Sequence, residues 1–304
     1  MSQFKDQLKG LWPAMFTPVN QEGKLNVPEL EKLIEMLIKE GVDGLYILGS
    51  TGQGFLFGEE ERKKIAELTI QIVNNRTGII VQVGAISTDE CVRLAKHAAK
   101  AGADAISSVG PIYYGASVNM AFEHYRKIAE ATDLPFIPYQ IGAATNDVMV
   151  DKLLKIPNIV GMKLTTANLL EISSVYRQTA GNWQLFSGAD ELICQAALCG
   201  TAGAIGSTYN VLPATFKKLR EDFLQGRTSM ASEFMLTFQN LIQDILPVIW
   251  TFYRRAMQLK HNIDMGDPKA PLLPGTLKWS DEEVLAILDN LEEIVNKSEV
   301  QVEN

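Results

Sequence analysis

A single lysine interrupts an apolar run near the middle of the chain. The run is IVGMKLT, residues 159–165, and residues typical of turns and helix starts flank it on both sides. Such a run is typical of a short interior strand. Burial favours the neutral amine of Lys163 over its ammonium, and a neutral amine can attack a carbonyl to form an imine. The alternative is that Lys163 reaches solvent or a partner carboxylate at the end of the strand.

Two hydroxyl side chains follow another apolar run in a glycine-rich turn. Ser50 and Thr51 lie in the sequence GSTGQG. A turn of this kind before a helix can present hydroxyls and backbone N–H groups to a carboxylate or phosphate. Its spacing fits neither the dinucleotide fingerprint nor the P-loop. A tight turn needs glycine in any case, so ligand binding and turn geometry both remain open here.

Phenols and carboxylates end further apolar runs. Tyr113 lies in GPIYYG and Tyr139 in PYQ, where each can relay a proton or pack at the mouth of the fold. Asp190 and Glu191 lie in SGADE, where helix capping would also explain them. A lysine, hydroxyls, phenols and carboxylates that meet on one rim would supply what carbonyl chemistry through a Schiff base requires.

Eight strand-like runs alternate with helix-like segments and would position these groups. The runs are residues 11–19, 44–49, 78–84, 105–110, 135–140, 159–165, 183–188 and 202–207. Repeated strand–helix–strand spacing predicts parallel strands with right-handed crossovers. Eight units predict an α/β fold, a closed (β/α)8 TIM barrel, whose chemistry lies at the C-terminal ends of the strands.

More helix follows the eighth run than one barrel unit needs. Helix-like segments cover residues 212–225, 228–259 and 281–297, whereas residues 261–279 are rich in Pro and Gly and predict an irregular crossing. We predict a barrel over residues 1–226. A C-terminal helical extension over residues 227–304 would pack on it as part of one structural unit.

Composition and charge exclude other classes of protein. With 46% hydrophobic and 21% charged residues, the chain can bury a large core. A net charge of -8 without a basic cluster argues against nucleic acid or an acidic membrane surface as a partner. The start has no apolar signal segment, and no run approaches the roughly 18 residues of a spanning helix. We therefore expect a cytoplasmic protein.

The cysteines and histidines show no pattern of a redox or metal site. The three cysteines are an odd set that fits a reducing compartment, and we expect buried structural thiols at Cys194 and Cys199. The three histidines are isolated and lack ligand spacing. We predict no metal.

Six motifs occur in order at the predicted strand ends: GSTGQGF, GPIYYG, PYQIG, GMKLT, SGADE and GAIGSTYN. Together they resemble the pyruvate-dependent class I aldolase family that includes dihydrodipicolinate synthase and N-acetylneuraminate lyase. The resemblance runs from about residue 11 to residue 210. It implies a lyase that acts on small molecules and needs no cofactor beyond the covalent imine with pyruvate.

The resemblance also implies a role for each matching position. Lys163 matches the lysine that forms the imine with the keto carbon of pyruvate. Tyr139 matches the phenol that moves the proton, and Ser50 and Thr51 match the turn that binds the pyruvate carboxylate. Tyr113 matches a tyrosine that reaches into a neighbouring subunit's site, which implies a homodimer or homotetramer.

The substrate end resembles the neuraminate lyases more than the synthases. Ile205 falls where a backbone carbonyl contacts pyruvate. The positions that match those holding a polyhydroxylated chain are Thr165, Gly188, Asp190, Glu191 and Ser207. Ala144 stands where the synthases carry an arginine, so the guanidinium fork for a second carboxylate is missing.

Two positions also depart from the lyases, since Gln53 replaces a glutamate and Gly142 a proline. We expect an enzyme that cleaves or condenses pyruvate with an aldehyde, acting on a sialic acid or a related 2-keto-3-deoxy sugar acid. The alternatives are a dihydrodipicolinate synthase, a 2-keto-3-deoxygluconate-type aldolase, and a non-catalytic protein that binds keto acids.

Overall fold

Eight parallel strands form the centre of the molecule. A computed structural model describes residues 8–114, 117–141 and 147–297 of the chain. The strands are β1 (Gly10–Pro13), β2 (Gly44–Ile47), β3 (Gly78–Gln82), β4 (Ala105–Val109), β5 (Phe136–Ile141), β6 (Gly161–Thr165), β7 (Gln184–Ser187) and β8 (Gly203–Gly206). Each pairs with its sequence neighbour from β2 to β8, and β8 pairs with β1. A parallel bridge between Ala14 and Tyr46 brings β1 beside β2, so the barrel is nearly closed.

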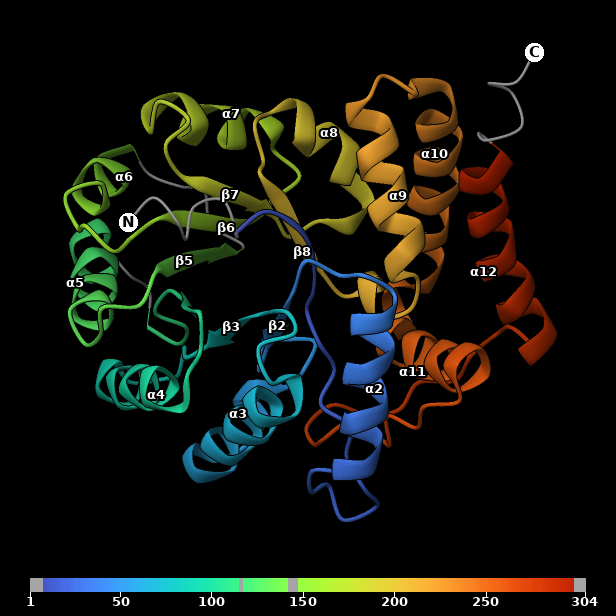
Figure 1. Ribbon diagram of the computed structural model, residues 1–304, viewed down its shortest axis with the longest axis horizontal. Helices are drawn as coiled ribbons and strands as arrows, with labels where there is room; N and C mark the ends of the chain where they lie inside the picture. Colours follow the sequence, from blue (N-terminus) through green and yellow to red (C-terminus); the bar gives the residue numbers. More distant parts are fainter. Residues whose placement is uncertain (1–7, 115–116, 142–146, 298–304) are drawn as a thin grey trace.

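A ring of helices surrounds the strands (Figure 1). These helices are α2 (Val27–Lys39), α3 (Glu59–Val73), α4 (Thr88–Ala101), α5 (Val118–Ala129), α6 (Asp147–Leu153), α7 (Leu169–Gln178) and α8 (Ile193–Leu198). Helix α4 shows how local signals set their bounds. The Ser87 hydroxyl accepts a hydrogen bond from the N–H of Glu90, and Gly102 ends the helix with a φ of 97°. The predicted (β/α)8 barrel is thus confirmed.

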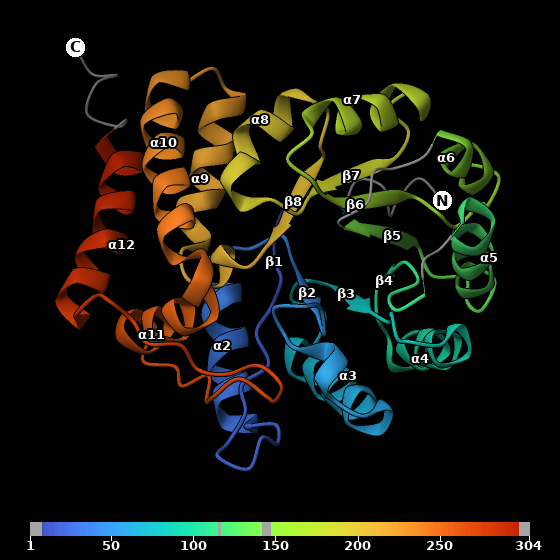
Figure 2. The same ribbon diagram turned by 180° about the vertical axis from the view of Figure 1, so that it is seen from behind.

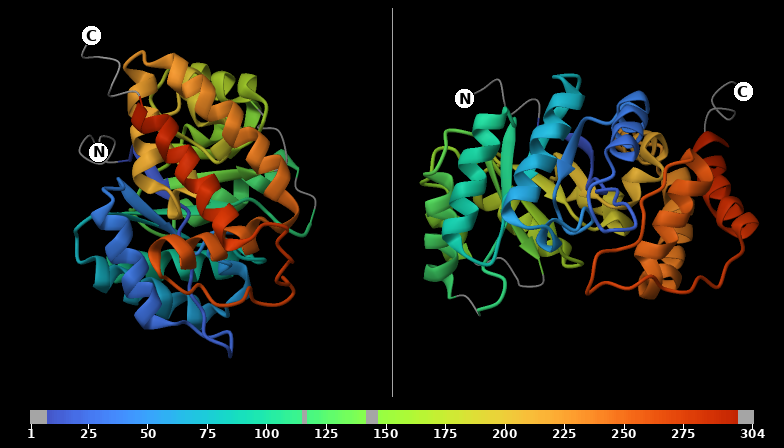
Figure 3. Two further views of the ribbon diagram at one scale, coloured as in Figure 1. Left: turned by 90° about the vertical axis from the view of Figure 1, so that its right-hand side faces the viewer. Right: turned by 90° about the horizontal axis from the view of Figure 1, so that it is seen from below.

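The helix after β8, α9 (Pro213–Leu224), packs on α8 and β1 and completes the ring, and three further helices lie beside it: α10 (Thr228–Ile245), α11 (Ile249–His261) and α12 (Asp281–Asn296). Figures 1 and 2 show α10 and α12 outside α9, and Figure 3 shows the group from its own side. Helix α12 packs against α9, α10 and α11. Whether residue 226 divides barrel from extension remains a prediction.

The predicted continuous helix over residues 228–259 is wrong. A short 3-10 turn, η4 (Leu246–Val248), separates α10 from α11. Pro247 lies within this turn, and proline cannot donate the backbone hydrogen bond that a continuing helix needs. The strand predicted over residues 11–19 is also too long, since β1 ends at Pro13. The irregular crossing is confirmed, because residues 262–280 hold no helix or strand.

Two apolar clusters lie on opposite sides of the strands. The larger fills the space between strands and helices. The smaller lies within the barrel and includes Trp12, Tyr46, Ile137, Phe186 and Ile205. Trp12 and Phe186 meet edge to face there, with ring centroids 6.2 Å apart. The barrel interior is therefore packed, and polar groups inside it occupy selected places.

Among the helices within the described residues, we find none with the length and apolar character needed to cross a membrane.

Candidate active site

Lys163 lies in strand β6 inside the barrel, and only 5% of it is exposed. Its ammonium nitrogen lies over two tyrosine rings, 4.3 Å from the ring centroid of Tyr139 and 4.6 Å from that of Tyr46. Among the described residues it has no ion-pair partner, so the alternative of a solvated or paired lysine does not hold in this structure. Burial lowers the pKa of Lys163 to about 7, while the charge of Asp190 opposes that shift. A large fraction of the amine is therefore neutral near neutral pH.

Tyr139 lies beside Lys163 on the neighbouring strand. The two residues are register partners across β5 and β6. The Tyr139 hydroxyl lies 3.1 Å from Oγ1 of Thr165, in a hydrogen bond that either group can donate. Burial raises the pKa of Tyr139, and the hydrogen bond with Thr165 opposes this. The phenol is thus neutral near pH 7 and has its oxygen at the open end of the strand.

Gly188 leaves room for these side chains at the end of β7. A Cβ at this position would lie 2.0 Å from Oγ1 of Thr165 and 3.0 Å from Cε of Lys163. Its backbone N–H donates to the carbonyl of Leu164, 2.8 Å away, which fixes the glycine against β6. A glycine is required here because any side chain would occupy the space of Lys163 and Thr165.

Asp190 begins the 3-10 turn η2 (Asp190–Leu192) and is buried. Its Oδ2 accepts the backbone N–H of Thr208 at 2.8 Å, whereas its Oδ1 has no hydrogen-bond partner among the described residues. Burial raises the pKa of Asp190 to about 6, although the Thr208 N–H opposes the shift. Its hydrogen bond goes to the loop after β8 and not to its own turn, so capping does not account for it.

The glycine-rich turn after β2 approaches the end of β8. Oγ1 of Thr51 lies 2.7 Å from Oγ of Ser207, and Thr51 is buried while Ser50 is exposed. Ile205, two residues before Ser207, is fully buried in β8. The predicted carboxylate-binding turn therefore lies at the same end of the barrel as Lys163 and Tyr139.

Gln53 ties this turn to the C-terminal crossing. It is buried and has a left-handed backbone, with a φ of 54°. Its Oε1 accepts the backbone N–H of Lys269 at 2.7 Å, and the Lys269 ammonium donates to the carbonyl of Gly23. The unusual residue at position 53 thus serves a contact between two loops, and that contact needs only an acceptor oxygen.

The remaining predicted positions are Tyr113 and Glu191, which the structure describes, and two positions outside the described residues. Tyr113 is 79% exposed and packs edge to face on Tyr114. Glu191 is half-buried next to Asp190, and its carbonyl accepts from the side chain of Gln239. Gly142 and Ala144 lie outside the described residues.

Two tyrosines near the cluster were not singled out from the sequence. Tyr46 lies in β2, four residues before Ser50, and its phenol faces the barrel interior, where an aliphatic residue would be ordinary. The hydroxyl of Tyr253, from α11, lies 2.5 Å from Oγ1 of Thr208 and so supports the loop that holds Asp190. A tyrosine at an inward-facing strand position could have pointed to Tyr46 in the sequence, whereas no local sequence feature points to Tyr253.

The thiols take no part in this cluster. Burial raises the pKa of Cys91 to about 11 and that of Cys194 to about 12, which leaves both as unreactive thiols. Cys194 is buried as expected, whereas the expectation for Cys199 is wrong because that residue is only half-buried. Within the described residues no group of three or more His, Cys, Asp or Glu side chains could hold a metal ion. The absence of a metal remains a prediction.

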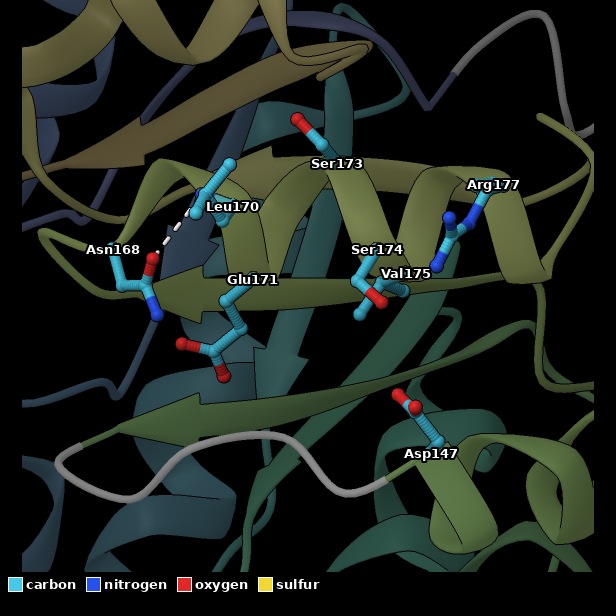
Figure 4. Close-up of a pocket in the computed structure, with 8 residues that line it drawn as sticks. All are labelled: Asp147, Asn168, Leu170, Glu171, Ser173, Ser174, Val175 and Arg177. Atoms are coloured by element: carbon cyan, nitrogen blue, oxygen red, sulfur yellow. Dashed lines mark hydrogen bonds between the residues drawn. The ribbon is translucent and has the colours of Figure 1, made fainter.

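A separate hollow lies between helices α6 and α7. Its volume is about 520 Å³. Figure 4 shows Asn168 and Glu171 at the first turn of α7, Arg177 near its last turn and Asp147 at the start of α6. None of its lining residues belongs to the cluster around Lys163. The two regions are chemically distinct, because the hollow has neither a buried amine nor a phenol.

Taken together, the residues around Lys163 can carry out carbonyl chemistry. A buried amine with a pKa near 7 can attack a ketone, a neutral phenol lies beside it, and hydroxyls from two loops lie at the same end of the barrel. The buried Oδ1 of Asp190 has no hydrogen-bond partner among the described residues and lies against Gly206 at the end of β8.

Comparisons with known proteins agree with this reading. The sequence model described as the Dihydrodipicolinate synthetase family matches residues 7–288. An N-acetylneuraminate lyase of Citrobacter koseri is 31% identical over 244 residues, which are 79% of this chain and 82% of that protein.

Two solved structures show similarity over nearly the whole chain. The N-acetylneuraminate lyase from Mycoplasma synoviae has a TM-score of 0.83 at 28% identity, and the match covers 95% of this chain and 98% of that one. The 4-hydroxy-tetrahydrodipicolinate synthase from Methylacidiphilum fumariolicum SolV has a TM-score of 0.86 at 27% identity, with 96% and 98% covered. Overall similarity therefore does not separate the two activities.

Proposed function

The chain belongs to the Dihydrodipicolinate synthetase family, whose lyase and synthase members are pyruvate-dependent class I aldolases, and we propose that it cleaves a sialic acid or a related 2-keto-3-deoxy sugar acid into pyruvate and an aldehyde. The observation that carries the proposal is Lys163. It is a buried lysine at the C-terminal end of a barrel strand, unpaired among the described residues, with a pKa lowered to about 7 and a phenol beside it.

Imine formation is the first step of the proposed reaction. The neutral amine of Lys163 adds to the keto carbon of the substrate, and the resulting carbinolamine loses its hydroxyl as water. Tyr139 donates the proton that this water carries away, which leaves a phenolate beside the new iminium. The elevated pKa of Tyr139 means that the phenol holds this proton until the neighbouring cation forms.

Cleavage of the carbon–carbon bond follows from the same two groups. The Tyr139 phenolate takes the proton of the β-hydroxyl, and the electrons of the bond between the α and β carbons move into the iminium. An aldehyde leaves, and an enamine remains on Lys163. The enamine carbon then takes the proton from Tyr139, and water hydrolyses the imine to release pyruvate and the free amine. The iminium thus replaces the enolate that an unassisted ketone would have to form.

Reductive trapping tests this mechanism. The protein is incubated with pyruvate, reduced with borohydride and digested, and the adduct is located by mass spectrometry. We expect one adduct, at Lys163, and none when lactate, which has no keto group, replaces pyruvate. An adduct at a different lysine, or no adduct at all, would contradict the mechanism.

The acceptor groups at the open end support a polyhydroxylated substrate. Oδ1 of Asp190 is buried against Gly206 without a hydrogen-bond partner among the described residues, and the hydroxyls of Thr165 and Ser207 lie in the adjoining strand ends. Buried acceptors of this kind favour a ligand with several hydroxyl donors. With Ala144 in place of an arginine, a second carboxylate substrate has no guanidinium at that position. We therefore favour the lyase over the synthase.

A substrate panel separates the candidates. Pyruvate release is measured from N-acetylneuraminate and from 2-keto-3-deoxygluconate, and condensation of pyruvate is measured with aspartate semialdehyde. We expect the highest kcat/KM with N-acetylneuraminate. Preference for either of the other two would assign the chain to the corresponding alternative. A trapped adduct without turnover of any substrate would point to the non-catalytic binding protein.

We further propose that the enzyme is a homodimer or homotetramer in the cytoplasm, with Tyr113 reaching a neighbouring subunit. The exposed pair Tyr113 and Tyr114 supports such a contact, because large aromatic side chains at this exposure are frequent in interfaces. Light scattering after size exclusion measures the assembly. A monomer with full activity would contradict this proposal. Neither metal nor cofactor is required, so dialysis against EDTA should leave turnover unchanged.

A further inference from the structure

Within the described part of the chain, the rings of Tyr46 and Tyr139 both face the reacting nitrogen of Lys163. Tyr46 comes from β2, on the far side of the barrel from β6, and is wholly buried. Its centroid lies 4.6 Å from Nζ of Lys163, and that of Tyr139 lies at 4.3 Å. Both distances are within the range in which an aromatic face attracts a cation.

The hydroxyl of Tyr46 has a different environment from that of Tyr139. It donates to Oγ of Ser107, 3.1 Å away and fully buried. Burial raises the pKa of Tyr46 far above the usual value for a phenol, so the group stays protonated at any working pH. The Tyr46 oxygen is therefore unsuited to proton transfer, and its ring is the part that faces the amine.

The position of this ring is fixed by its surroundings. A Cβ on Gly49 would lie 2.7 Å from Cε1 of Tyr46, so the glycine before Ser50 allows the ring its place. The carbonyl of Tyr46 accepts the N–H of Met15 at 2.9 Å, and the ring packs within the inner apolar cluster. An immobile ring face is a preorganised partner, which costs no rearrangement when a charge appears beside it.

Imine formation creates a cation that needs such a partner. The neutral amine, the ketone and the proton that Tyr139 donates give a protonated imine and water, so a positive charge appears on a nitrogen that is almost excluded from solvent. The titratable groups of the described residues that face it are Tyr139 from β5, Tyr46 from β2 and Asp190 after β7. Asp190 is itself partly protonated near pH 6, because burial raises its pKa. Tyr139 gives up its proton in the proposed reaction, whereas Tyr46 keeps its own, so the ring face of Tyr46 is the partner whose effect does not depend on pH.

We propose that Tyr46 is a further catalytic residue of this enzyme, whose ring stabilises the positively charged nitrogen of Lys163 both as the ammonium and as the substrate iminium. The inference rests on the proposed function for its iminium part. It applies to the ammonium whether or not the chain turns over a sugar acid. The chemistry belongs to the face of the ring, so it depends on the electron density of the ring and not on the hydroxyl.

Fluorination of the ring at position 46 tests this without a change of shape. Phenylalanine and 3,4,5-trifluorophenylalanine are each placed at position 46 by suppression of a stop codon. Tyr46→Phe is the reference of the pair, since both lack the hydrogen bond with Ser107. Fluorine withdraws electron density from the ring face and so weakens its attraction for a cation. The same exchange at Phe136 is the matched control, because Phe136 is a buried ring of β5 in the larger apolar cluster between strands and helices.

The first readout is the titration of Lys163 itself, followed by NMR of 13Cε-labelled lysine and assigned through the Lys163→Met variant. We expect the midpoint for Lys163 to fall by about half to one pH unit on fluorination at position 46, and not at position 136. An unchanged midpoint would overturn the proposal. A buried ring that only filled space would leave the midpoint unmoved, because the two rings have nearly the same shape.

The second readout is the rate of pyruvate trapping by borohydride at pH 9, where the amine is neutral in both variants. Fluorination at position 46 should slow it about three- to tenfold, which corresponds to the same half to one pH unit. If the wild-type protein forms no adduct at Lys163, the proposed function and the iminium part both fail, while the titration still decides the ammonium part. If an adduct forms at equal rates in both variants, the iminium part alone is overturned.

Discussion

Two buried cations lie in the same barrel and have opposite surroundings. Arg62 projects from α3 toward the end of β3, and Lys163 projects from β6. They are 2% and 5% exposed. The Arg62 guanidinium donates to the carbonyls of Gly84 and Gln82 and to Oε1 of Gln82, at 2.9 to 3.1 Å. Lys163 meets two ring faces and has no ion pair within the described residues.

The two residues differ in the number of hydrogen-bond acceptors around the charged group. Burial lowers the pKa of both residues, but a guanidinium starts from so high a value that it stays charged. Its charge is then compensated by carbonyl oxygens, and the result is a rigid joint between α3 and β3. Lys163 has few acceptors, so the amine loses its proton easily and becomes reactive. A buried cation is thus a structural or a chemical group according to whether protein oxygens accept hydrogen bonds from its charged end.

Replacement of Lys163 should have the largest effect on turnover. We expect Lys163→Met to abolish pyruvate trapping and to reduce turnover by about 10⁴-fold or more, because the nucleophile is lost. The same variant should be more stable than the wild type at pH 6, on the order of a few kcal/mol, because it no longer buries a poorly compensated charge.

The pH dependence of that stability gain has a definite sign. The pKa of Lys163 is about 7 in the folded protein against a reference of 10.5. Between these values the unfolded chain binds a proton that the folded chain does not, so wild-type stability rises with pH across this window. The advantage of Lys163→Met should therefore shrink from pH 7 toward pH 10, as measured by urea unfolding. If Lys163→Met is instead less stable than the wild type at pH 6, Lys163 has a structural role like that of Arg62.

Replacement of Arg62 should instead affect stability. Arg62→Met leaves buried carbonyls without donors, and we expect a loss of about 3 kcal/mol or more in the free energy of unfolding. Lys63→Met, on the same helix but in an ion pair with partly exposed Glu59, should have a much smaller effect on stability, because the ion pair is screened by solvent. The folded fraction of Arg62→Met should still form the adduct at Lys163. If folded Arg62→Met protein forms no adduct, Arg62 is not a purely structural residue.

Removal of the Asp190 charge should lower the pKa of Lys163 further and so increase its difference from Arg62. The rate of pyruvate trapping should rise with pH as the Lys163 amine loses its proton, and this rise is the acidic limb of the pH profile. Asp190 raises the pKa of Lys163, so Asp190→Asn should move the acidic limb to lower pH. Turnover of the sugar acid should fall about 10- to 100-fold, because a charged acceptor is lost. Glu191→Gln is the control and should leave the position of the limb in place. A limb that moves to higher pH would show that Asp190 does not act on the amine in this way.

The smallest effect is expected at the support of Asp190. Tyr253→Phe removes the hydrogen bond with Thr208 and should cost about 1 kcal/mol of stability. The KM for the sugar acid should rise a few-fold while pyruvate trapping stays the same, because the loop of Thr208 holds Asp190 and not Lys163. Thr208→Val removes the same bond, so the double variant should be no worse than either single one. Additive losses would show that the two side chains act separately.

Much of the fold could be predicted from local patterns. Apolar runs with β-branched residues, separated by capped helices, indicated eight strands and the bounds of α4, because strand and helix periods are properties of neighbouring residues. The helix over residues 228–259 was mispredicted although Pro247 lies within it, since its apolar pattern continues on both sides. The ends of the strands were less well predicted than their existence, as the early end of β1 shows.

The chemistry of Lys163, Tyr139 and Asp190 could be suspected from the places where their strands end. Their environment could not, because it depends on closure of the barrel. Only closure places Tyr46, 117 positions earlier in the chain, over the amine of Lys163, and only closure brings the Thr208 N–H to Asp190. The local sequence determines which side chains lie at the ends of strands, because the end of a strand depends on neighbouring residues. Exclusion of water and the meeting of distant side chains set the pKa values, and these exist only in the folded barrel.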